Sequence, residues 1–572
     1  MRRPWLPAVV VVAAACVAYA TTWHNYFVQD DFGVVSLLYP KPAFYFPQWF
    51  VSTWMDHIWG YTPDEIRPFP AVTYQLAAIF GPTSTVTNHV MNIAIHAGNG
   101  VLVLAIGVEA AALSVPAAAL AAVVFVLLPV QAESVAWITG RVDSMPAFFY
   151  AASFLAWVRW RAGGRARSYL WSLGLFFVAL FSKQNTITLA PALVLWDGIV
   201  GGSLLAVRGR QSTGGSSRVA RDSWRSADGL GLVAVGRRVW RWALPYLPFV
   251  VLTVGYLALR YVLFGEIARE GQLNAQSADF FTAVVARHLR RLVFGTVLGA
   301  ALDTLTAGTA VSWAALAVTV VAVGLVGLRS SIDRWRAARV ALYFGIAWIA
   351  LGVAPVAVAG YESLRHVYLA SIGWAVALGV AFDVLWSARP VRAWRPVAAV
   401  AGAAVLAVYS VQLAGEVRTW NLRATVSRLA VADLEREALA APDGTLVIAG
   451  APKRSWEWAV PFVLQPPYTK VDQTKRVLLV SPWLLHCCRS DWEEYTRRTL
   501  QAWAARADRP PIVALYWDER TGDLSKLTDA EEPYLRSFIP VLLGTDNRET
   551  FNEAMTDMLR DLVLPHKLRR DP

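Results

Sequence analysis

The chain has 572 residues, of which 56% are hydrophobic and only 16% are charged, and its mean hydropathy is +0.41. This composition excludes an ordinary water-soluble protein and predicts a polytopic α-helical membrane protein. The only cysteines are Cys16, Cys487 and Cys488, which excludes a disulfide framework and a thiolate zinc site. The net charge of +12 comes from arginines gathered in a few short loops, so the sequence gives no support for a nucleic-acid partner.

Apolar runs near 20 residues, long enough for a hydrocarbon core of about 30 Å, predict about eleven transmembrane helices. They lie approximately at 5–22, 87–108, 111–130, 143–160, 168–182, 185–203, 243–264, 309–328, 340–359, 367–386 and 397–414. With the N-terminus inside, the arginine-rich segments fall on the cytoplasmic side, as the positive-inside rule requires. An odd number of spans then places everything after Glu416 outside. Arginine greatly outnumbers lysine, which hints at a bacterial source and hence at the inner (cytoplasmic) membrane.

The first apolar run, 5–22, also has the form of a cleaved signal peptide. No convincing small-x-small cleavage site precedes Thr21, so we expect the run to remain as the first span. Beyond it, an aromatic and proline-interrupted outer loop at 23–86 carries the adjacent carboxylates Asp30 and Asp31. The first span therefore delivers two acids to one face of the membrane, a place where a lipid-linked substrate could be met.

Two further segments have distinctive compositions. Residues 204–237 are rich in Ser, Gly and Arg and predict a flexible cytoplasmic linker. The outer loop at 265–308 contains an apolar sequence that basic residues punctuate at helical spacing, at Arg287, His288, Arg290 and Arg291. This pattern predicts an interfacial amphipathic helix over 280–298.

The chain becomes soluble in character after Glu416. Short apolar runs occur at 445–449, 476–481 and 511–517. Helical stretches, at 416–440 and 491–505, alternate with them. Strands that alternate with helices predict a small extracytoplasmic α/β domain over 416–572, so the transmembrane domain covers 1–415.

Polar and ionisable residues recur at the outer ends of later spans. They are Glu133, Arg141, Asp143, Lys183, Gln184, Arg365 and His366. Such residues in or beside a membrane are functional candidates by default, although any one alone fits a solvated loop residue or a helix cap equally well. By the topology above they share the side of Asp30. A cluster of acids and bases there fits a site that binds an anionic lipid phosphate and activates a hydroxyl.

At these positions the sequence resembles a family. The motifs, in chain order, are Asn25 to Asp31, Arg67 to Phe69, Asn88 to Asn92 with His96, Glu133 to Val135 followed by Gly140 to Asp143, Ser182 to Thr188, and Arg365 to Gly373. Together they resemble the transmembrane O-mannosyltransferases that carry tetratricopeptide repeats, a branch of the glycosyltransferase C superfamily. The resemblance covers residues 20–375. It implies a glycosyltransferase C fold and the use of a polyprenyl-phosphate sugar on the lumenal or periplasmic face.

The sequence also departs from this family. Leu364 stands where the family has a glutamate, Gln184 replaces the acid of a lysine–glutamate pair, and Leu128 replaces a histidine. Residues 430–572 show no 34-residue helical repeat, so the peptide-recognising superhelix is absent. The resemblance therefore does not fix the donor sugar, a metal or the acceptor.

The resemblance implies that one of the two adjacent acids takes the proton of an acceptor hydroxyl, and we name Asp30 first and Asp31 second. A base of this kind contributes about 10²–10⁴-fold in rate. Repulsion between neighbouring carboxylates predicts a raised pKa for one of them. The alternative is that both acids merely cap the loop after the first span.

Departure of the lipid phosphate needs positive charge at fixed geometry, and the planar fork of arginine suits phosphate oxygens. Arg365 and Lys183 are the predicted phosphate ligands, and Arg141 is the predicted ion-pair partner of Asp143 or Glu133. The predicted substrate-binding set also includes Arg67, Gln184, His366 and Tyr368.

His89 and His96 lie seven residues apart and hence on one face of a helix. Helix packing is their expected role, and a metal or substrate contact is the alternative. A divalent metal is therefore the one cofactor that the sequence leaves open.

Two rival classes of function remain. A transporter or flippase of lipid-linked sugars would also need many spans, but it would show an internal repeat and polar residues at mid-bilayer, and neither is evident. A membrane-anchored sensor or scaffold that acts through 416–572 leaves Asp30, Asp31 and Lys183 unexplained.

The predicted function is therefore transfer of a sugar, with mannose the first candidate, from a polyprenyl phosphate to a protein, glycan or lipid acceptor. The predicted partners are the lipid-linked sugar, membrane lipid and that acceptor.

Overall fold

The computed structural model describes residues 5–38, 41–54, 65–81, 84–201, 242–267, 278–304, 332–360, 363–388, 391–450, 462–473, 477–480, 490–508, 510–518 and 523–526, and a few residues between 539 and 554. The chain divides into two compact units. The first comprises Met1–Ala20, Val90–Ala136 and Gly140–Val417, and the second comprises Thr21–His89, Trp137–Thr139 and Arg418–Pro572. The loop at 23–86, which carries the two acids, thus belongs to the same unit as the C-terminal residues.

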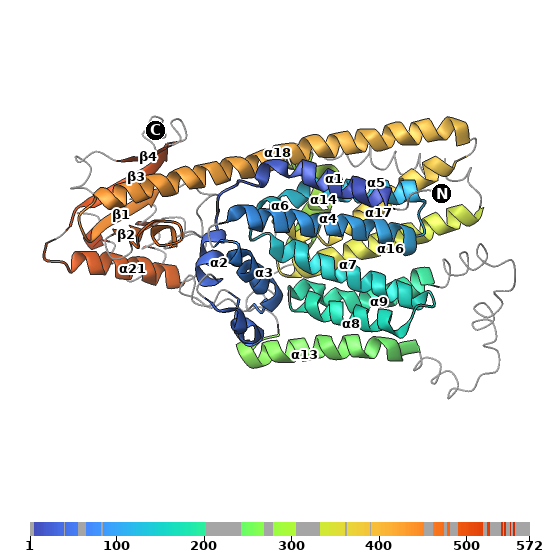
Figure 1. Cartoon of the computed structure of the whole chain (residues 1–572), viewed down its shortest axis with the longest axis horizontal. Coiled ribbons are helices and arrows are strands. Elements are labelled where there is room, and N and C mark those ends of the chain that lie inside the picture. The colour runs from blue at the N-terminus through green and yellow to red at the C-terminus, as the bar shows by residue number, and fades with distance from the viewer. Residues whose placement is uncertain are drawn as a thin grey trace. The chain divides into compact units, whose positions relative to one another are not determined.

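Apolar helices make up most of the first unit (Figure 1). In chain order they are α1 (Leu6–Ala18), α4 (Thr85–Glu109), α5 (Val115–Leu127), α7 (Arg141–Arg161), α8 (Ala166–Leu180), α9 (Leu189–Trp196), α13 (Leu247–Phe264), α14 (Ala278–Thr304), α16 (Ile332–Val358) and α17 (Ala370–Ser387). Five helices of the described residues are long and apolar enough to cross a membrane, or six if the bent pair Val115–Leu127 and Pro129–Ala136 is one span. The chain is therefore that of a membrane protein with several apolar helices.

Every predicted span except one contains a helix, although α9 covers only Leu189–Trp196 of the span predicted at 185–203. The exception, 309–328, lies outside the described residues. The total of eleven spans and the cytoplasmic N-terminus stay predictions. The last predicted span and the helical stretch 416–440 merge, because α18 (Val391–Ala440) is a single helix of 50 residues (Figure 1).

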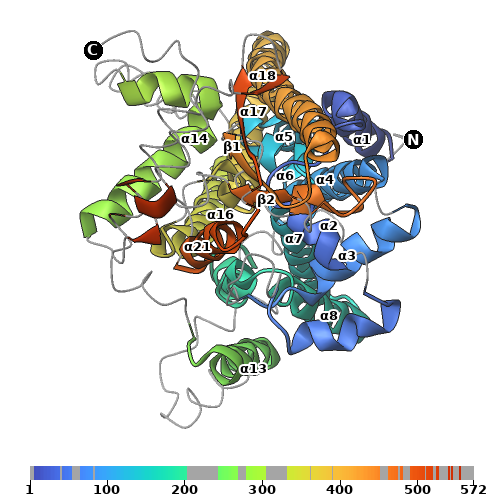
Figure 2. The ribbon, with the colours of Figure 1, turned by 90° about the vertical axis from the view of Figure 1, so that its left-hand side faces the viewer.

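Glycines let α16 and α17 run side by side with their backbones in contact (Figure 2). A Cβ atom at Gly373 would lie 2.5 Å from the carbonyl oxygen of Gly345, and one at Gly352 would lie 2.8 Å from the backbone of Ala370. Real Cβ atoms do not approach that closely, so no larger residue fits at these positions unless the helices separate. Small residues at helix contacts are typical of membrane bundles, where close packing replaces the hydrophobic drive.

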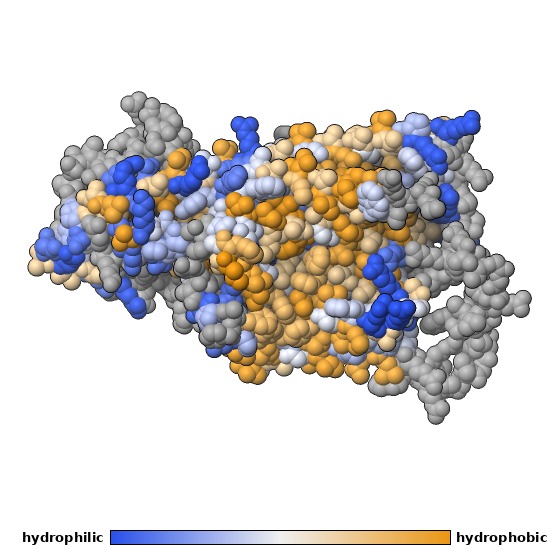
Figure 3. Space-filling view, viewed as in Figure 1, coloured by the Kyte–Doolittle hydropathy of each residue, from blue (hydrophilic) through white to orange (hydrophobic). Residues whose placement is uncertain are grey.

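The face of this helical unit that Figure 3 shows is largely apolar. Large apolar side chains that face outward include Val9 and Val17 of α1, Leu170 of α8, and Val251 and Val254 of α13. A contiguous apolar surface of this extent marks a surface that water does not cover. It fits contact with lipid acyl chains.

Three short helices lie within the loop at 23–86 of the second unit. They are α2 (Asp31–Leu38), η2 (Ala43–Phe50) and α3 (Pro68–Ile79). Pro68 occupies the first turn of α3, where its missing N–H costs nothing and its fixed φ favours the helix. The acid Asp31 stands in the first turn of α2, where the helix dipole favours negative charge.

The second unit also contains a four-stranded sheet with the order β2-β1-β3-β4. Its strands are β1 (Thr445–Gly450), β2 (Val477–Val480), β3 (Ile512–Asp518) and β4 (Asp523–Lys526). Strand β1 pairs in parallel with β2 and β3, and β4 is antiparallel to β3. Helix α21 (Ser490–Ala504) packs against β1 and β2. The predicted alternation of strands and helices is therefore present, and β4 is the strand that the pattern did not predict.

Two other predictions concern long loops. The linker 204–237 lies outside the described residues. The predicted helix over 280–298 falls within α14, which has a break at Gly295, where φ is 75°. Its position at the membrane interface stays a prediction.

Candidate functional site

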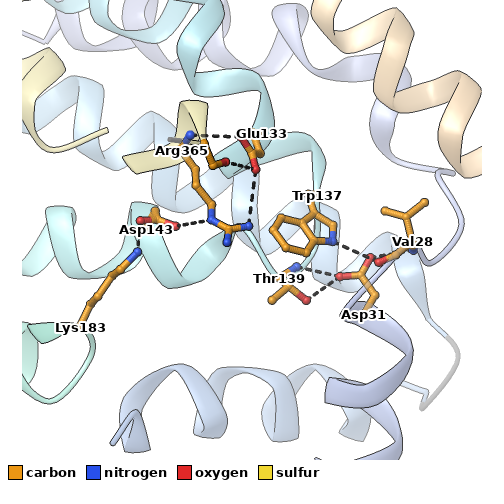
Figure 4. A network of polar contacts seen from close by, with 9 residues as sticks. Val28, Asp31, Glu133, Trp137, Thr139, Asp143, Lys183 and Arg365 are labelled. Carbon is orange, nitrogen blue, oxygen red and sulfur yellow. Dashed lines mark hydrogen bonds and ion pairs between the residues drawn. The ribbon is translucent and has the colours of Figure 1, made fainter. Parts of the chain in front are cut away.

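The two acids lie in a tight turn of the second unit, and hydrogen bonds close this turn around Asp31 (Figure 4). Oδ1 of Asp31 accepts hydrogen bonds from the backbone N–H and the hydroxyl of Thr139, at 2.9 and 2.7 Å, and Oδ2 accepts from the N–H of Val28 at 3.0 Å. Between them Gln29 has a φ of 50°, a left-handed conformation that non-glycine residues adopt at a cost and that often marks a functional site. Asp31 is only 1% exposed, whereas Asp30 is partly exposed. We call residues 28–31 the acidic turn.

Asp31 titrates far from the ordinary range of an aspartate. Burial raises its pKa from 3.8 to about 7, against the hydrogen bonds from Thr139 and Val28, which lower it. The charge of Asp30 raises it further but is the smallest of these causes. One of the two pKa values is thus raised, and desolvation is a larger cause than the repulsion on which the expectation rested.

Neighbouring side chains in the second unit fix the backbone of the acidic turn. The indole N–H of Trp137 donates to the carbonyl of Val28 at 3.1 Å (Figure 4). The hydroxyl of Ser427, in α18, donates to the carbonyl of Phe27 at 2.6 Å. These bonds satisfy carbonyls that a left-handed turn leaves outside any helix or sheet.

Four charged residues of the first unit form a second cluster, which we call the basic cluster (Figure 4). Lys183 pairs with Oδ1 of Asp143. Nε of Arg365 lies 3.5 Å from Oδ2 of Asp143, and its Nη1 lies 3.5 Å from Oε1 of Glu133. Glu133 also accepts a hydrogen bond from the backbone N–H of Arg365 at 3.2 Å and one from the hydroxyl of Ser363.

The two bases of the basic cluster are held differently. Lys183 and Asp143 are buried, with side chains only 7% and 2% exposed, and they form a close pair. The side chain of Arg365 is 25% exposed, and its contacts to carboxylates are longer than the 2.7–2.9 Å or so of a strong charge-assisted bond. Arg365 is therefore the more exposed and more loosely held of the two basic side chains, while Lys183 neutralises a buried acid.

A buried polar network supports the short helix η7 (Leu364–Val367) that carries Arg365. The hydroxyl of Tyr368 lies 2.7 Å from Nδ1 of His96 and accepts a hydrogen bond from Asn99 at 3.1 Å. Ser371 donates to the carbonyl of Tyr368 and accepts a 2.7 Å hydrogen bond from Gln131. Tyr368, which the sequence assigned to substrate binding, is buried in these contacts and braces the loop, and its binding role stays a prediction.

The prediction that Arg141 pairs with Asp143 or Glu133 does not describe the contacts of Asp143, which pairs with Lys183 and Arg365. Arg141 is fully buried, and its Nε donates to the amide oxygen of Asn92 at 2.7 Å. Lys183, and not Arg141, pairs with Asp143. Lys183 lies in the turn between α8 and η4 (Gln184–Thr188). That turn can bring its ammonium group to Asp143.

The remaining predicted binding residues have separate surroundings. Arg67, in the second unit, pairs with Glu65 at 2.8 Å and lies over the ring of Trp54 at 5.9 Å. Gln184, in η4 of the first unit, has a buried Oε1 with no hydrogen-bond partner within the described ranges. His366 is buried in η7. Their binding roles stay predictions.

Both candidate metal-binding histidines are buried and make contacts of hydrogen-bond length. Nε2 of His89 lies 3.2 Å from the carbonyl oxygen of Asn25. Both ring nitrogens of His96 are engaged, since Nε2 lies 3.1 Å from the carbonyl oxygen of Val126 and Nδ1 faces Tyr368. In the part of the chain that the structure describes, no three His, Cys, Asp or Glu residues are placed to hold a metal ion.

Sequence reasoning missed the neutral residues that position the charged ones. Thr139 holds Asp31, Asn92 holds Arg141, and Asn99 holds Tyr368. The sequence pattern that could have identified these positioning residues is a small polar residue within or beside a charged motif in an apolar chain. Such groups are buried only with a partner, which points to contacts across the fold.

No protein-family model matches the chain. Among curated proteins, the Mus musculus protein O-mannosyl-transferase TMTC3 is 24% identical over 200 residues, which are 33% of this chain and 21% of that protein. The Homo sapiens protein O-mannosyl-transferase TMTC4 is 26% identical over 231 residues, which are 34% of this chain and 30% of that protein. The chain thus spans less than a third of the length of these relatives. The predicted resemblance to the transmembrane O-mannosyltransferases is confirmed over that part of the chain.

Among solved structures, ArnT from Cupriavidus metallidurans bound to undecaprenyl phosphate is 14% identical, with a TM-score of 0.46 over 90% of this chain and 93% of that chain. The arabinofuranosyltransferase AftD from Mycobacteria is 15% identical, with a TM-score of 0.40 over 84% of this chain and 32% of that chain.

Proposed function

We propose that this protein is a membrane glycosyltransferase that moves a sugar from a polyprenyl phosphate to a hydroxyl group of an acceptor. The acidic turn is the observation that carries the proposal. It combines a partly exposed Asp30, a buried Asp31 that three donors hold, and a strained backbone at Gln29. Loop capping alone needs neither the strain nor the burial.

Asp30 is the proposed general base, because its partly exposed carboxylate is the one that an acceptor hydroxyl can reach. In the reaction the acceptor oxygen forms a bond to C1 of the sugar, and its proton passes to this carboxylate. A single displacement of this kind inverts the configuration at C1. Asp31 keeps Val28 and Thr139 in place and so fixes the direction in which Asp30 points.

The bond between C1 and the phosphate oxygen breaks in the same step, and the polyprenyl phosphate leaves with the electron pair. Arg365 is the proposed ligand of that phosphate. Its guanidinium is partly exposed and loosely paired with Glu133 and Asp143, and a planar fork binds phosphate oxygens in a bidentate manner. Lys183 lowers the net negative charge of the carboxylates, which would otherwise repel the phosphate.

Mannose is the first candidate sugar, because the aligned relatives are named O-mannosyl-transferases. A hexose or pentose other than mannose, and a protein, glycan or lipid hydroxyl as acceptor, fit the chemistry equally. The proposed location is the extracytoplasmic face of the inner membrane. Reporter fusions after Glu416 test this location: an exported signal supports it, and a cytoplasmic signal overturns the topology together with the assignment of the site to that face.

The decisive test measures transfer of labelled mannose from polyprenyl phosphomannose to membranes of a deletion strain, which supply the acceptor. Purified Asp30→Asn should bind the donor but lose about 10²–10⁴-fold in transfer rate, and Asp31→Asn should lose less. Asp508→Asn is the matched control, because this carboxylate is exposed and pairs with Arg506 in the same unit. Full transfer by the double variant at positions 30 and 31 would refute the mechanism, and lipid-linked sugar translocation would then be measured to test the transporter alternative.

A further inference from the structure

Tyr468 reaches the acidic turn from the C-terminal part of the second unit. It lies on the connection between β1 and β2, 437 residues from Asp31 in sequence. Its hydroxyl donates to the carbonyl of Phe32 at 2.5 Å and lies 3.4 Å from the carbonyl of Asp31. Its ring packs edge-on against Phe32 and Phe27, with centroid distances of 4.7 and 5.3 Å.

Hydrogen bonds hold the described part of this connection, residues 462–473. The N–H of Gln473 donates to the carbonyl of Leu464 at 2.8 Å, and the N–H of Val477, at the start of β2, donates to the carbonyl of Gln473 at 2.8 Å. The N–H of Lys470 donates to the carboxylate of Glu435, in α18, at 2.7 Å. Tyr468 therefore projects from a segment that is tied to both the sheet and α18.

From these contacts we infer that Tyr468 is a positioning residue for the acids and that the C-terminal α/β part of the chain completes the reaction site. This inference rests on the proposed function. The hydroxyl holds the carbonyls of the first turn of α2, and that turn begins at Asp31. The position of Tyr468 thus sets the direction of both carboxylates without contact between its side chain and the substrate.

The ring of Tyr468 has a second effect, because it covers Phe27 and Phe32 and helps to keep water from Asp31. Desolvation is the main cause of the raised pKa of Asp31. The phenols that face the turn do not titrate near neutral pH, since burial raises the pKa of Tyr26 to about 12 and that of Tyr468 well above its ordinary value. Glu435 faces Tyr26, and Asp30 is the acid beside Asp31.

The first arm of the test measures turnover. Tyr468→Phe keeps the ring and loses the hydroxyl, so kcat should fall about 2–10-fold, the equivalent of one hydrogen bond, with the donor KM unchanged. Tyr468→Ala should lower kcat more than tenfold. Val471→Ala is the matched control, because Val471 lies in the same connection and is 56% exposed. Unchanged kcat in both tyrosine variants would overturn the inference.

The second arm needs no turnover. Thermal unfolding is followed from pH 5 to pH 9 in the wild type, Tyr468→Ala, Asp31→Asn and the double variant. If the ring of Tyr468 keeps water from Asp31, the inflection near pH 7 in the plot of melting temperature against pH should move to lower pH in Tyr468→Ala. The same substitution should cause no such movement in a protein that already carries Asp31→Asn. An inflection at the same pH with and without the ring would overturn the inference. A wild type without transferase activity would refute the proposed function, and this arm would still decide whether Tyr468 holds the turn.

Discussion

The Asp31→Asn variant should be more stable than the wild type above pH 7 and no more stable below pH 5. Burial raises the pKa of Asp31 from 3.8 to about 7, so the folded protein holds this proton more tightly than the unfolded chain does. The stabilising contribution is therefore complete below the unfolded pKa and is lost as the pH rises through the folded one. The amide of Asn has no charge to bury, so position 31 makes the unfolding free energy of the Asp31→Asn variant no more dependent on pH across that interval.

The size of the effect follows from the same values. A difference of roughly three pKa units corresponds to about 4 kcal/mol. The oxygen of Asn still accepts both hydrogen bonds from Thr139, but its amide N–H then faces the N–H of Val28, at a cost of about 1–2 kcal/mol. The net gain in unfolding free energy at pH 8 is thus about 2–3 kcal/mol. At pH 5 about 1–2 kcal/mol of the effect of burial remains, because the carboxyl group of the unfolded chain is still largely ionised, so the variant and the wild type are about equally stable.

Chemical denaturation in a mild detergent at each pH measures this difference. Asp508→Asn is the control, because its exposed carboxylate has no burial to relieve and should leave the pH dependence of the wild type unchanged. Curves for Asp31→Asn and the wild type that stay parallel from pH 5 to pH 9 would show that burial does not govern the titration of Asp31.

Four further predictions concern the first unit. Arg365→Ala should weaken binding of polyprenyl phosphate by about 1.5–3 kcal/mol with little loss of thermal stability, and undiminished affinity in a ligand titration would remove Arg365 from the site. Lys183→Ala should instead destabilise the fold by about 3–5 kcal/mol, because it leaves the buried Asp143 without its close partner; recovery of the melting temperature in Lys183→Ala combined with Asp143→Asn checks this. Tyr368→Phe should cost about 1–3 kcal/mol of stability through unpaired buried groups, and an unchanged unfolding midpoint would contradict the bracing role. Gly373→Val should separate α16 from α17 and lower the yield of folded protein, whereas a normal size-exclusion profile with full stability would show that the helices can part at no cost.

The helices were predictable from the sequence because a span is a local property. A run of apolar residues identifies α13 and α16 whatever lies around them. The strands β1, β2 and β3 were also predictable, since short apolar runs between helical stretches are local signals. By contrast, the sequence predicted a span at 397–414 and a separate helical stretch at 416–440, whereas α18 is one continuous helix over both. No residue in its middle stops the helix.

The contacts of the candidate site were only partly predictable. The motifs named the charged residues, but the pairing of Lys183 with Asp143 joins positions 40 residues apart, and the partners of Asp31 include Thr139, 108 residues away. Charge alone allowed Arg141 as the partner of Asp143. The choice among bases depends on where each turn points its side chain, which hydropathy and spacing do not encode.

The three donors that converge on Asp31 have a consequence for the environment in which the protein works. A protonated carboxyl group itself donates a hydrogen bond, so uptake of a proton either displaces the N–H of Val28 or turns the hydroxyl of Thr139 from donor to acceptor. A fall in pH through 7 would thus rearrange the hydrogen bonds of the acidic turn. Because Asp30 follows from the same backbone, the direction of its carboxylate would respond to the pH of the solution that this turn faces.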